Sequence, residues 1–547
     1  KTADLSNSRP ESTKKADFPA TANTGPETFR LKLSPFSMSA LLTGITAYIV
    51  AGVVSLIYPR RRFWINLLGW AGGLGGLIQG IWIHQKSGTK VFTLGEWGEL
   101  GVEFKLDETT LLFAGLVVTL NLFTLLYLQG TKKGTFYALY NFLLVSTYSM
   151  AFSHDLFNIY VTIEFMSLAA ILLIGYGRKA YQIYAGIKYL LVSSLAMSLY
   201  LIGLGLVYRG GGQLSIAELE RMIDGKPEFT LSLGISLMIS GLAVKGGVML
   251  FSMWLPDAHG YSGTVVSALL SGLAIKSGLV GVIRLAELVN WNTLWLFLGS
   301  LTGITGGIFA LLGRRPKRIL AYSTISQIGY VLLGVGAGTP AGILAAALNI
   351  FFHGLFKSLL FLSVGHAGVG DRDVFSGESF PVPTESIVGL SVGTLSILAI
   401  PPFSKYFSKA FLLESSNQSW ITWIMLLIGL GTATYVVKLD WALLLKSHRK
   451  PLAEGGWALI TYSLFVAASG LVAWMVLGRH EITGLLTLHH IVLYLSLPLA
   501  GLLIFLVLKN KLKAVKSPRL PFNLDNALVS VFTGFLFIEL ALVIFGL

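Results

Sequence analysis

Residues 245–278, KGGVMLFSMWLPDAHGYSGTVVSALLSGLAIKSG, hold a lysine near each end of a mostly apolar stretch that a Pro-Asp-Ala-His sequence interrupts. Similar apolar stretches recur along the 547-residue chain, of which 54% is hydrophobic and only 12% is charged. A soluble protein carries about a quarter charged residues. Many of the stretches are long enough, at about 18 residues or more, to cross a bilayer as a helix. The sequence therefore predicts an all-α polytopic membrane protein.

The chain contains no cysteine and carries a net charge of +14. Without thiolates it cannot ligate an iron–sulfur cluster through cysteine, form a disulfide or use a thiol nucleophile. We therefore expect no cofactor and no metal in this chain, and any redox chemistry belongs to a partner. The basic residues lie in short connections between apolar stretches, where membrane topology explains them, so we expect no nucleic-acid partner.

We expect about sixteen membrane spans, each a long apolar run that ends at polar or charged residues. The expected spans are 36–58, 63–84, 109–130, 135–153, 155–176, 181–208, 230–256, 261–287, 291–313, 318–338, 340–366, 385–415, 419–445, 455–477, 488–508 and 525–547.

The charges of the connections predict the orientation of these spans. Odd-numbered connections, such as residues 60–62 and 314–318, are rich in Lys and Arg, whereas 85–108 and 209–229 are neutral or acidic. Residues 367–384 are an exception because acidic residues outnumber the one arginine. Since Lys and Arg concentrate on the cytoplasmic side, we expect a multi-pass protein of the cell membrane with both termini outside.

Within the expected spans we single out six charged side chains. They are Glu164, Lys188, Lys245, Lys276, Lys357 and Lys409. Each costs about 2.5–3.5 kcal/mol at a helix centre if it stays charged and unpaired, so we expect them to pair, to contact water or to exchange protons. Burial favours the neutral form of a lysine, which suits proton transfer. The alternative is that some extend toward a membrane surface, and this alternative is strongest for Lys188.

The expected span 340–366 carries a polar stripe. Asn349, His353 and Lys357 follow one another at intervals of four residues, so they share one helix face. Histidine titrates near neutral pH, and the stripe therefore suits a proton relay. A buried histidine satisfied by a carbonyl group is the alternative for His353, and we interpret His366 as structural.

Two expected spans contain proline breaks. One break is at Pro256 and the other at Pro401 and Pro402. Proline exposes backbone carbonyls, which a membrane helix tolerates only where protein or a wet cavity covers them. Two broken helices in corresponding places of two halves are typical of transporters built from inverted repeats. A lysine lies near each break, Lys245 before the first and Lys409 after the second.

Four stretches carry a family resemblance. They are HDLFNIYVTIEFMSLAAILLIGY (154–176), KGGVMLFSMWLPDAHGYSGTVVSALLSGLAIKSG (245–278), RRPKRILAYSTISQIGYVLLG (314–334) and HGLFKSLLFLSVG (353–365). Together they resemble the antiporter-like subunits shared by respiratory complex I, Mrp-type Na⁺/H⁺ antiporters and membrane-bound energy-converting hydrogenases. The sequence DLFNIYVTIEF is most similar to the D-type member of the Mrp antiporters and to its relatives in hydrogenase and sulfur-reductase complexes.

The resemblance implies a fourteen-helix antiporter-like core with two inverted five-helix repeats, in which helices 7 and 12 are broken. About two C-terminal helices would be extra. The implied organisation is a flexible polar tail at 1–34, helices 1–3 at 35–134, the first repeat at 135–287, the second repeat at 288–445 and helices 14–16 at 446–547.

The resemblance also implies a hydrophilic axis along the membrane. The positions that match the family's pathway are Glu164, Lys245, Lys276, His353, Lys357 and Lys409. In this pattern Glu164 pairs with Lys245, Lys276 bridges the two halves, and Lys409 is the terminal lysine. Some complex I relatives have glutamate at that last position, and some relatives have histidine where this chain has Asn349.

We therefore expect an ion-translocating subunit, moving protons and possibly exchanging Na⁺ for H⁺, in a larger Mrp-like respiratory complex. The expected partners are other membrane subunits, including a second antiporter-like or a small one, and a peripheral redox module with iron–sulfur clusters, possibly nickel–iron, as in a hydrogenase or sulfur reductase. The alternatives are a stand-alone multisubunit Na⁺/H⁺ antiporter, a complex I proton-pumping subunit, a quinone-binding subunit, or a structural homologue that has lost transport.

Overall fold

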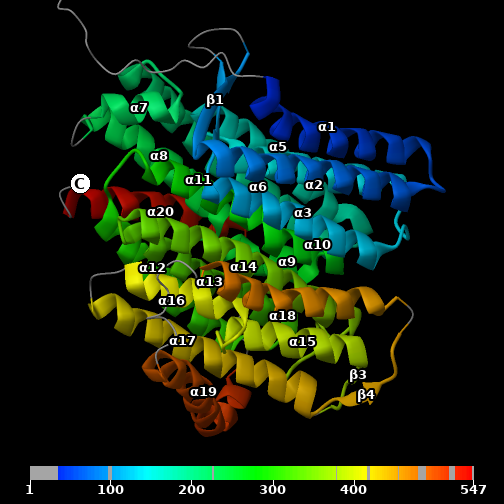
Figure 1. Cartoon of the computed structure of the whole chain (residues 1–547). Helices are drawn as coiled ribbons and strands as arrows, with labels where there is room; N and C mark the ends of the chain where they lie inside the picture. The colour runs from blue at the N-terminus through cyan, green and yellow to red at the C-terminus, as the bar shows by residue number, and fades with distance from the viewer. Residues whose placement is uncertain are drawn as a thin grey trace, which may run out of the picture.

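The computed structural model describes residues 35–95, 101–223, 227–376, 378–415, 419–453, 455–477, 488–515 and 524–544. The expected tail at 1–34 lies outside them. Long helices run side by side, and in Figure 1 the N-terminal helices lie in the upper part of the molecule and most of the C-terminal helices in the lower part. The last helix, α20, breaks this order and returns to the middle of the molecule, against α8 and α6.

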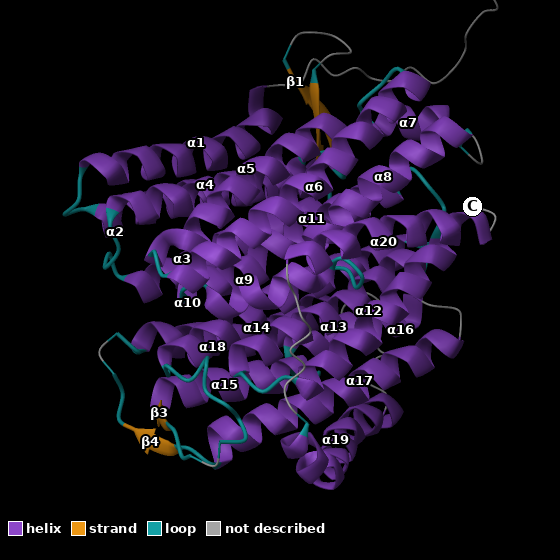
Figure 2. Cartoon of the chain, turned by 180° about the vertical axis from the view of Figure 1, so that it is seen from behind, coloured by secondary structure: helices purple, strands orange, loops and turns teal. Residues whose placement is uncertain are grey.

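Helices account for almost all of the described chain (Figure 2). The first half contains α1 (Pro35–Ile57), α2 (Arg62–Ser87), α3 (Glu108–Leu128), α4 (Gly134–Phe152), α5 (Leu156–Ile174), α6 (Ala180–Gly211), α7 (Ile216–Met222), α8 (Phe229–Gly246), α9 (Leu255–Tyr261), α10 (Thr264–Leu269) and α11 (Ile275–Ala286). The second half contains α12 (Asn292–Leu312), α13 (Pro316–Gly336), α14 (Pro340–His366), α15 (Thr384–Ile397), α16 (Ser404–Ser415), α17 (Ser419–Asp440), α18 (Trp457–Leu477), α19 (Leu488–Ala514) and α20 (Leu524–Ile544).

Eleven helical segments are long and apolar enough to cross a membrane, and three shorter apolar helices accompany them in the described chain. This confirms a helical, multi-pass membrane protein, as expected where the backbone must satisfy its own hydrogen bonds within a bilayer. Each of the expected spans contains a helix or a broken pair of helices. The count of about sixteen and the division into inverted repeats stay predictions.

The first break lies earlier than the sequence indicated. Helix α8 ends at Gly246, and the chain then takes left-handed backbone angles at Gly247 (φ 67°) and Leu250 (φ 80°). Pro256 begins the next helix, α9, in its first turn. Proline is tolerated there because the first-turn N–H has no partner within the helix. The prediction that Pro256 makes the break was therefore wrong, because the turn at Gly246–Gly247 makes it.

The second break lies where it was predicted. Helix α15 ends at Ile397, Ala399 has a left-handed φ of 60°, and α16 begins at Ser404. Pro401 and Pro402 lie in the connection between them. A further irregularity, a π-helical segment at Leu270–Ala274, joins α10 to α11. The sequence analysis did not predict this segment.

Close helix packing sets the distances between the elements. At the crossing of α12 and α13, a Cβ atom added to Gly329 would lie 2.6 Å from Cα of Gly303. Small residues at such crossings allow two backbones to approach closely, which is the main way membrane helices gain packing energy.

Two small sheets lie among the helices. An antiparallel hairpin pairs β1 (Lys90–Leu94) with β2 (Val102–Leu106), with Lys90 opposite Leu106. The second sheet pairs β3 (Pro381–Pro383) with β4 (His448–Lys450) in parallel. The hairpin lies at the end of the bundle that also carries α7 (Figure 1).

Candidate functional site

The lysines that the sequence singled out are all buried. Their exposed fractions are 1% for Lys188, 2% for Lys245, 0% for Lys276, 0% for Lys357 and 3% for Lys409. None of them therefore reaches a membrane surface in the manner of an extended side chain. The alternative interpretation of Lys188 as such a residue is wrong.

Lys245 is held by hydroxyl groups at the end of α8. Its Nζ donates to Oγ of Ser167 on α5 at 2.6 Å and to the hydroxyl of Ser193 on α6. The ring of Tyr189 lies 5.7 Å from the ammonium group. A lysine in the last turn of a helix also faces the negative end of the helix dipole. All of these partners are uncharged.

Glu164 lies on α5, less than one turn before Ser167, and it is half-buried rather than enclosed. Its neighbours Phe165 and Leu168 are exposed, so this face of α5 is open in the isolated chain. Among the described residues no ion pair within 4.0 Å joins Glu164 to Lys245, although the two interact electrostatically over a longer distance.

Lys245, Lys276, Lys357 and Lys409, on α8, α11, α14 and α16, form a series that we call the lysine row. The middle of this row lies around α11 and α14. Lys276 Nζ donates to the carbonyl of Ser271, which belongs to the π-helical segment. Lys357 Nζ donates to the carbonyl of Leu320 at 3.1 Å and to the hydroxyl of Ser323, both on α13. The π-helical segment therefore supplies the acceptor for one lysine, and α13 supplies the acceptors for the other.

His353 lies among these lysines. It interacts electrostatically with Lys276 and Lys357, and neither of its ring nitrogens has a hydrogen-bond partner within the described residues. His259, on α9, shares this property and stacks on Phe361 with ring centroids 5.0 Å apart. A buried imidazole without protein partners is costly unless water or an exchanging proton satisfies it.

The sequence analysis missed Lys405, which belongs to the same row. It is fully buried on α16 and donates to Oδ1 of Asn349. Its ammonium lies 5.0 Å from the ring of Tyr330, and that of Lys409 lies 4.8 Å from the same ring. The four-residue spacing of the two lysines, which puts them on one helix face, was the signal that could have found it.

Lys188 differs from the rest because a carboxylate holds it. Its Nζ lies 2.8 Å from Oδ2 of Asp257, and Arg318 contacts the other oxygen of that carboxylate at 3.1 Å. Asp257 comes from the Pro-Asp-Ala-His sequence at the start of α9. The pairing ties α6 and α13 to the broken-helix region.

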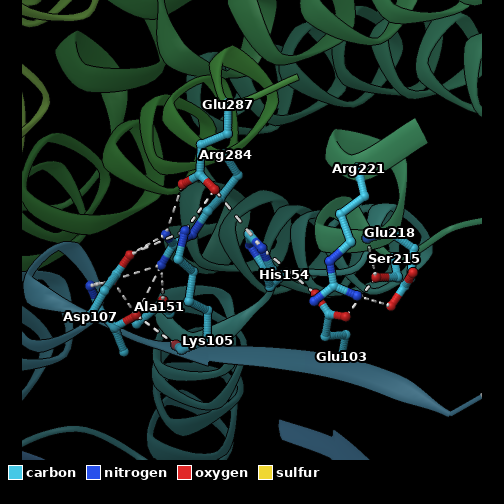
Figure 3. Close-up of polar contacts among 11 residues, drawn as sticks. Glu103, Lys105, Asp107, Ala151, His154, Ser215, Glu218, Arg221, Arg284 and Glu287 are labelled. Atoms are coloured by element: carbon cyan, nitrogen blue, oxygen red, sulfur yellow. Dashed lines mark hydrogen bonds and ion pairs between the residues drawn. The ribbon is translucent and has the colours of Figure 1, made fainter. Parts of the chain in front are cut away.

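A second charged cluster, which the sequence analysis also missed, lies at the hairpin end of the bundle (Figure 3). Arg284 near the end of α11 donates to both oxygens of Asp107, at 2.6 and 3.0 Å. Lys105 on β2 donates to Glu287 at 2.7 Å. Arg284 lies three residues from the end of its expected span, where arginine is usually interpreted as a surface residue.

This cluster alters the titration of its members. Burial raises the pKa of Asp107, but the Arg284 guanidinium and its hydrogen bonds outweigh burial and hold that pKa well below its usual range. Burial, with the nearby charges of Arg284 and Lys105, lowers the pKa of His154 to about 2. Burial raises the pKa of Glu103.

Comparison with known proteins places these features in a family. The family model NADH:quinone oxidoreductase/Mrp antiporter, TM matches residues 153–434, more than half of the chain. The N-type subunit of NADH-quinone oxidoreductase from Desulforudis audaxviator is 29% identical over 382 residues, which cover 65% of this chain and 75% of that protein. The D-type subunit of the Na⁺/H⁺ antiporter from Alkalihalophilus pseudofirmus is 29% identical over 414 residues, covering 71% and 84%.

Two solved structures have the same fold. A chain of the membrane-bound sulfane sulfur reductase, an archaeal respiratory membrane complex, superposes with a TM-score of 0.73 at 20% identity over 86% of this chain and all of that one. A chain of the Mrp complex from Dietzia superposes with a TM-score of 0.68 at 22% identity over 93% and 99%. The family resemblance found in the sequence is confirmed, and this chain belongs to the family of antiporter-like membrane subunits of NADH:quinone oxidoreductase and Mrp-type assemblies.

Proposed function

We propose that this chain translocates protons along its row of buried lysines, as a subunit of a larger membrane complex in the cell membrane. The observation that carries the proposal is the kind of partner these lysines have. Lys245, Lys276 and Lys357 donate to hydroxyl and carbonyl groups, not to carboxylates. A buried lysine with neutral partners can lose its proton without leaving an unpaired carboxylate behind.

The proposed transfer uses Lys245 as the group that switches. Glu164 and Lys245 interact electrostatically, and a change at the half-open face of α5 alters that interaction. Unit charges 4 Å apart interact by about 4 kcal/mol at an effective dielectric constant of 20. That energy changes the proton affinity of a group by a factor of about 1,000, since about 1.4 kcal/mol corresponds to tenfold.

Protons then move through Lys276, His353 and Lys357 toward Lys405 and Lys409. The unpartnered nitrogens of His353 suit a group that accepts a proton from one side and donates it to the other. We also assign Lys188 to the lysine row. Because it is paired with the carboxylate of Asp257, it suits an electrostatic role better than the transfer of protons. Na⁺ prefers oxygen ligands, so a row of lysines favours protons, and Na⁺ exchange would use other subunits.

We further propose that the complex includes a redox module with iron–sulfur clusters, in which nickel–iron is one option. The similarity in fold to a chain of a sulfane sulfur reductase complex supports this assignment. The expected partners are other membrane subunits, among them a second antiporter-like or a small one. We place both termini of the chain outside the cell, because the connection charges favour that orientation.

The second candidate is a subunit of a stand-alone Na⁺/H⁺ antiporter. The similarity to the D-type antiporter subunit, at 29% identity, favours it. Purification of the native assembly in mild detergent separates the two candidates through its co-purified subunits and metal content. Iron with or without nickel supports the redox-coupled complex, and a metal-free assembly of small membrane subunits supports the antiporter.

The experiment that tests proton translocation uses vesicles containing the native assembly and a pH-sensitive dye. Proton flux is measured after a potassium diffusion potential is imposed with valinomycin. We expect Lys245→Ala to abolish the flux while the subunit is present in normal amount. The matched control is Lys132→Gln, which changes an exposed lysine of a connection. Unchanged flux in Lys245→Ala would overturn the proposal.

A further inference from the structure

The charged cluster at the hairpin end contains an incomplete contact between Glu103 and His154. Glu103, on β2, is 7% exposed, and one of its carboxyl oxygens, Oε2, accepts from the hydroxyl of Ser215 at 2.6 Å. The other oxygen, Oε1, has no hydrogen-bond partner among the described residues. It lies 3.6 Å from Nε2 of His154, slightly beyond hydrogen-bond distance. His154 is itself 1% exposed, and its Nδ1 has no partner in the described chain.

The charges around this contact do not balance. Three carboxylates, Glu103, Asp107 and Glu287, face two cations, Lys105 and Arg284. Arg284 pairs with Asp107 and with Glu287. Lys105 pairs with Glu287, and its Nζ lies 3.9 Å from Oδ2 of Asp107. Glu103 has no cationic partner within 4.0 Å among the described residues other than the imidazole of His154. Figure 3 shows His154 between Glu287 and Glu103.

Other charged groups around Glu103 increase this excess. Asp155 and Glu218 both act on Glu103 with negative charge. Arg221 pairs with Glu218 at 2.8 Å on the surface of α7 and offsets its charge. Asp155, at the start of α5, therefore adds negative charge near this buried carboxyl, and Glu287, directly after α11, adds more at the far side of the imidazole. A buried excess negative charge of this kind is relieved by binding one proton.

We propose that Glu103 and His154 form a proton-binding site at the hairpin end of the bundle, which exchanges protons with the medium on the predicted outer side. This role rests on the proposed function, since it gives the translocated proton a group at the membrane surface. In the loaded state the carboxyl O–H at Oε1 donates to Nε2 of the neutral imidazole. On release the O–H bond breaks and the proton passes to water. The carboxylate that remains accepts from Ser215.

The site is tested by infrared spectroscopy of the native assembly at a series of pH values. A protonated carboxyl group has its own C=O stretching band, so the titration is read without any transport. We expect a carboxyl band that disappears with a midpoint above 4.5, the ordinary value for glutamate, and that is absent in Glu103→Gln. The matched control is Glu220→Gln, an exposed glutamate of the neighbouring helix α7, which should keep the band and its midpoint.

A second variant keeps the test decisive if Glu103→Gln fails to accumulate. His154→Gln removes the imidazole acceptor and should shift both the frequency and the midpoint of the same band. An unshifted band in His154→Gln, or a retained band in Glu103→Gln, overturns the site. A midpoint that moves with Na⁺ concentration also overturns it, because the site would then bind the cation. Unchanged flux in Lys245→Ala together with a titrating carboxyl band would overturn the proposed function and leave the proton-binding site standing, so the two failures are distinguishable.

Discussion

Two buried cations on the same helix have different partners. Lys276 and Arg284 lie eight residues apart on α11, and both are 0% exposed. Lys276 donates to a single backbone carbonyl, that of Ser271. Arg284 contacts the carboxylates of Asp107 and Glu287 and the hydroxyl of Thr110. The helix therefore carries one cation that is electrically compensated and one that is not.

The difference assigns different roles to the two ends of α11. A carboxylate partner stabilises the charged form, and removing either partner leaves a buried unpaired charge. A carbonyl partner satisfies an N–H group but does not compensate the charge, so the lysine can lose its proton. Lys245 and Lys357 have neutral partners, as Lys276 has, whereas Lys188 is paired with the carboxylate of Asp257, as Arg284 is with that of Asp107.

The largest expected effect is on transport. Lys276→Gln removes the group that we propose bridges the two halves of the lysine row, and we expect proton flux to fall by roughly 100-fold or more, the scale of a lost acid–base group. The measurement is dye-monitored flux in vesicles, normalised to the amount of the subunit. Lys132→Gln serves again as the exposed control. Flux within twofold of wild type in Lys276→Gln would show that proton transfer does not need Lys276.

The next effect is on stability and concerns Arg284. Arg284→Gln removes the cation hydrogen-bonded to Asp107 and leaves only Lys105, 3.9 Å away, to compensate this buried carboxylate. Breaking a buried ion pair in this way costs up to about 3–5 kcal/mol. We expect a lower unfolding temperature for the assembly in detergent and less subunit in the membrane. Asp107→Asn added to Arg284→Gln should recover part of the loss because no carboxylate is then stranded. If the single variant unfolds at the wild-type temperature, the cluster does not stabilise the chain.

A smaller effect concerns the pH dependence of stability, which reports on His154 in the same charged cluster. The pKa of His154 is lowered to about 2, below the ordinary 6.5, so the unfolded chain binds a proton that the folded protein excludes. Acidification below 6.5 therefore destabilises the folded state, by up to about 1.4 kcal/mol per pH unit. His154→Gln removes this cost, so its unfolding temperature should rise relative to wild type between pH 7 and pH 5. A constant difference over that interval contradicts the neutral imidazole.

The smallest effect concerns a neutral partner of Lys245. Ser193→Ala removes one of two hydroxyl acceptors, worth about 1 kcal/mol, while Ser167 still holds the ammonium. We expect proton flux to change by about fivefold with normal assembly. Complete loss of flux would show that the hydroxyl is part of the transfer route and not only a support for the lysine.

The sequence predicted the features that depend on long patterns. Apolar runs located the helices, because a membrane span needs about 20 apolar residues. Charges inside those runs located Lys245, Lys276 and Lys357, because a charge inside a span costs free energy and is therefore rare. Contacts between distant segments were not predictable. The sequence analysis did not single out Arg284, because nothing in its own neighbourhood indicated that Asp107 lies against it, 177 positions away.

Local backbone geometry was also hard to predict. Proline is the usual signal of a broken helix, yet the first break forms at Gly247, and Pro256 only begins the next helix. The π-helical segment that supplies the acceptor for Lys276 has no proline and no distinctive composition. Lys405 was missed because the family pattern directed attention to Lys409 alone, although both side chains are buried on the same helix.

Whether protons move along the lysine row is decided by the proton flux of Lys276→Arg in vesicles containing the native assembly. Arginine keeps the positive charge and nearly the size of lysine but does not lose its proton at any physiological pH. If Lys276 takes up and releases protons, the variant assembles normally and proton flux falls to background. Flux at the wild-type rate would show that only the charge at this position matters and would contradict proton transfer along the lysine row.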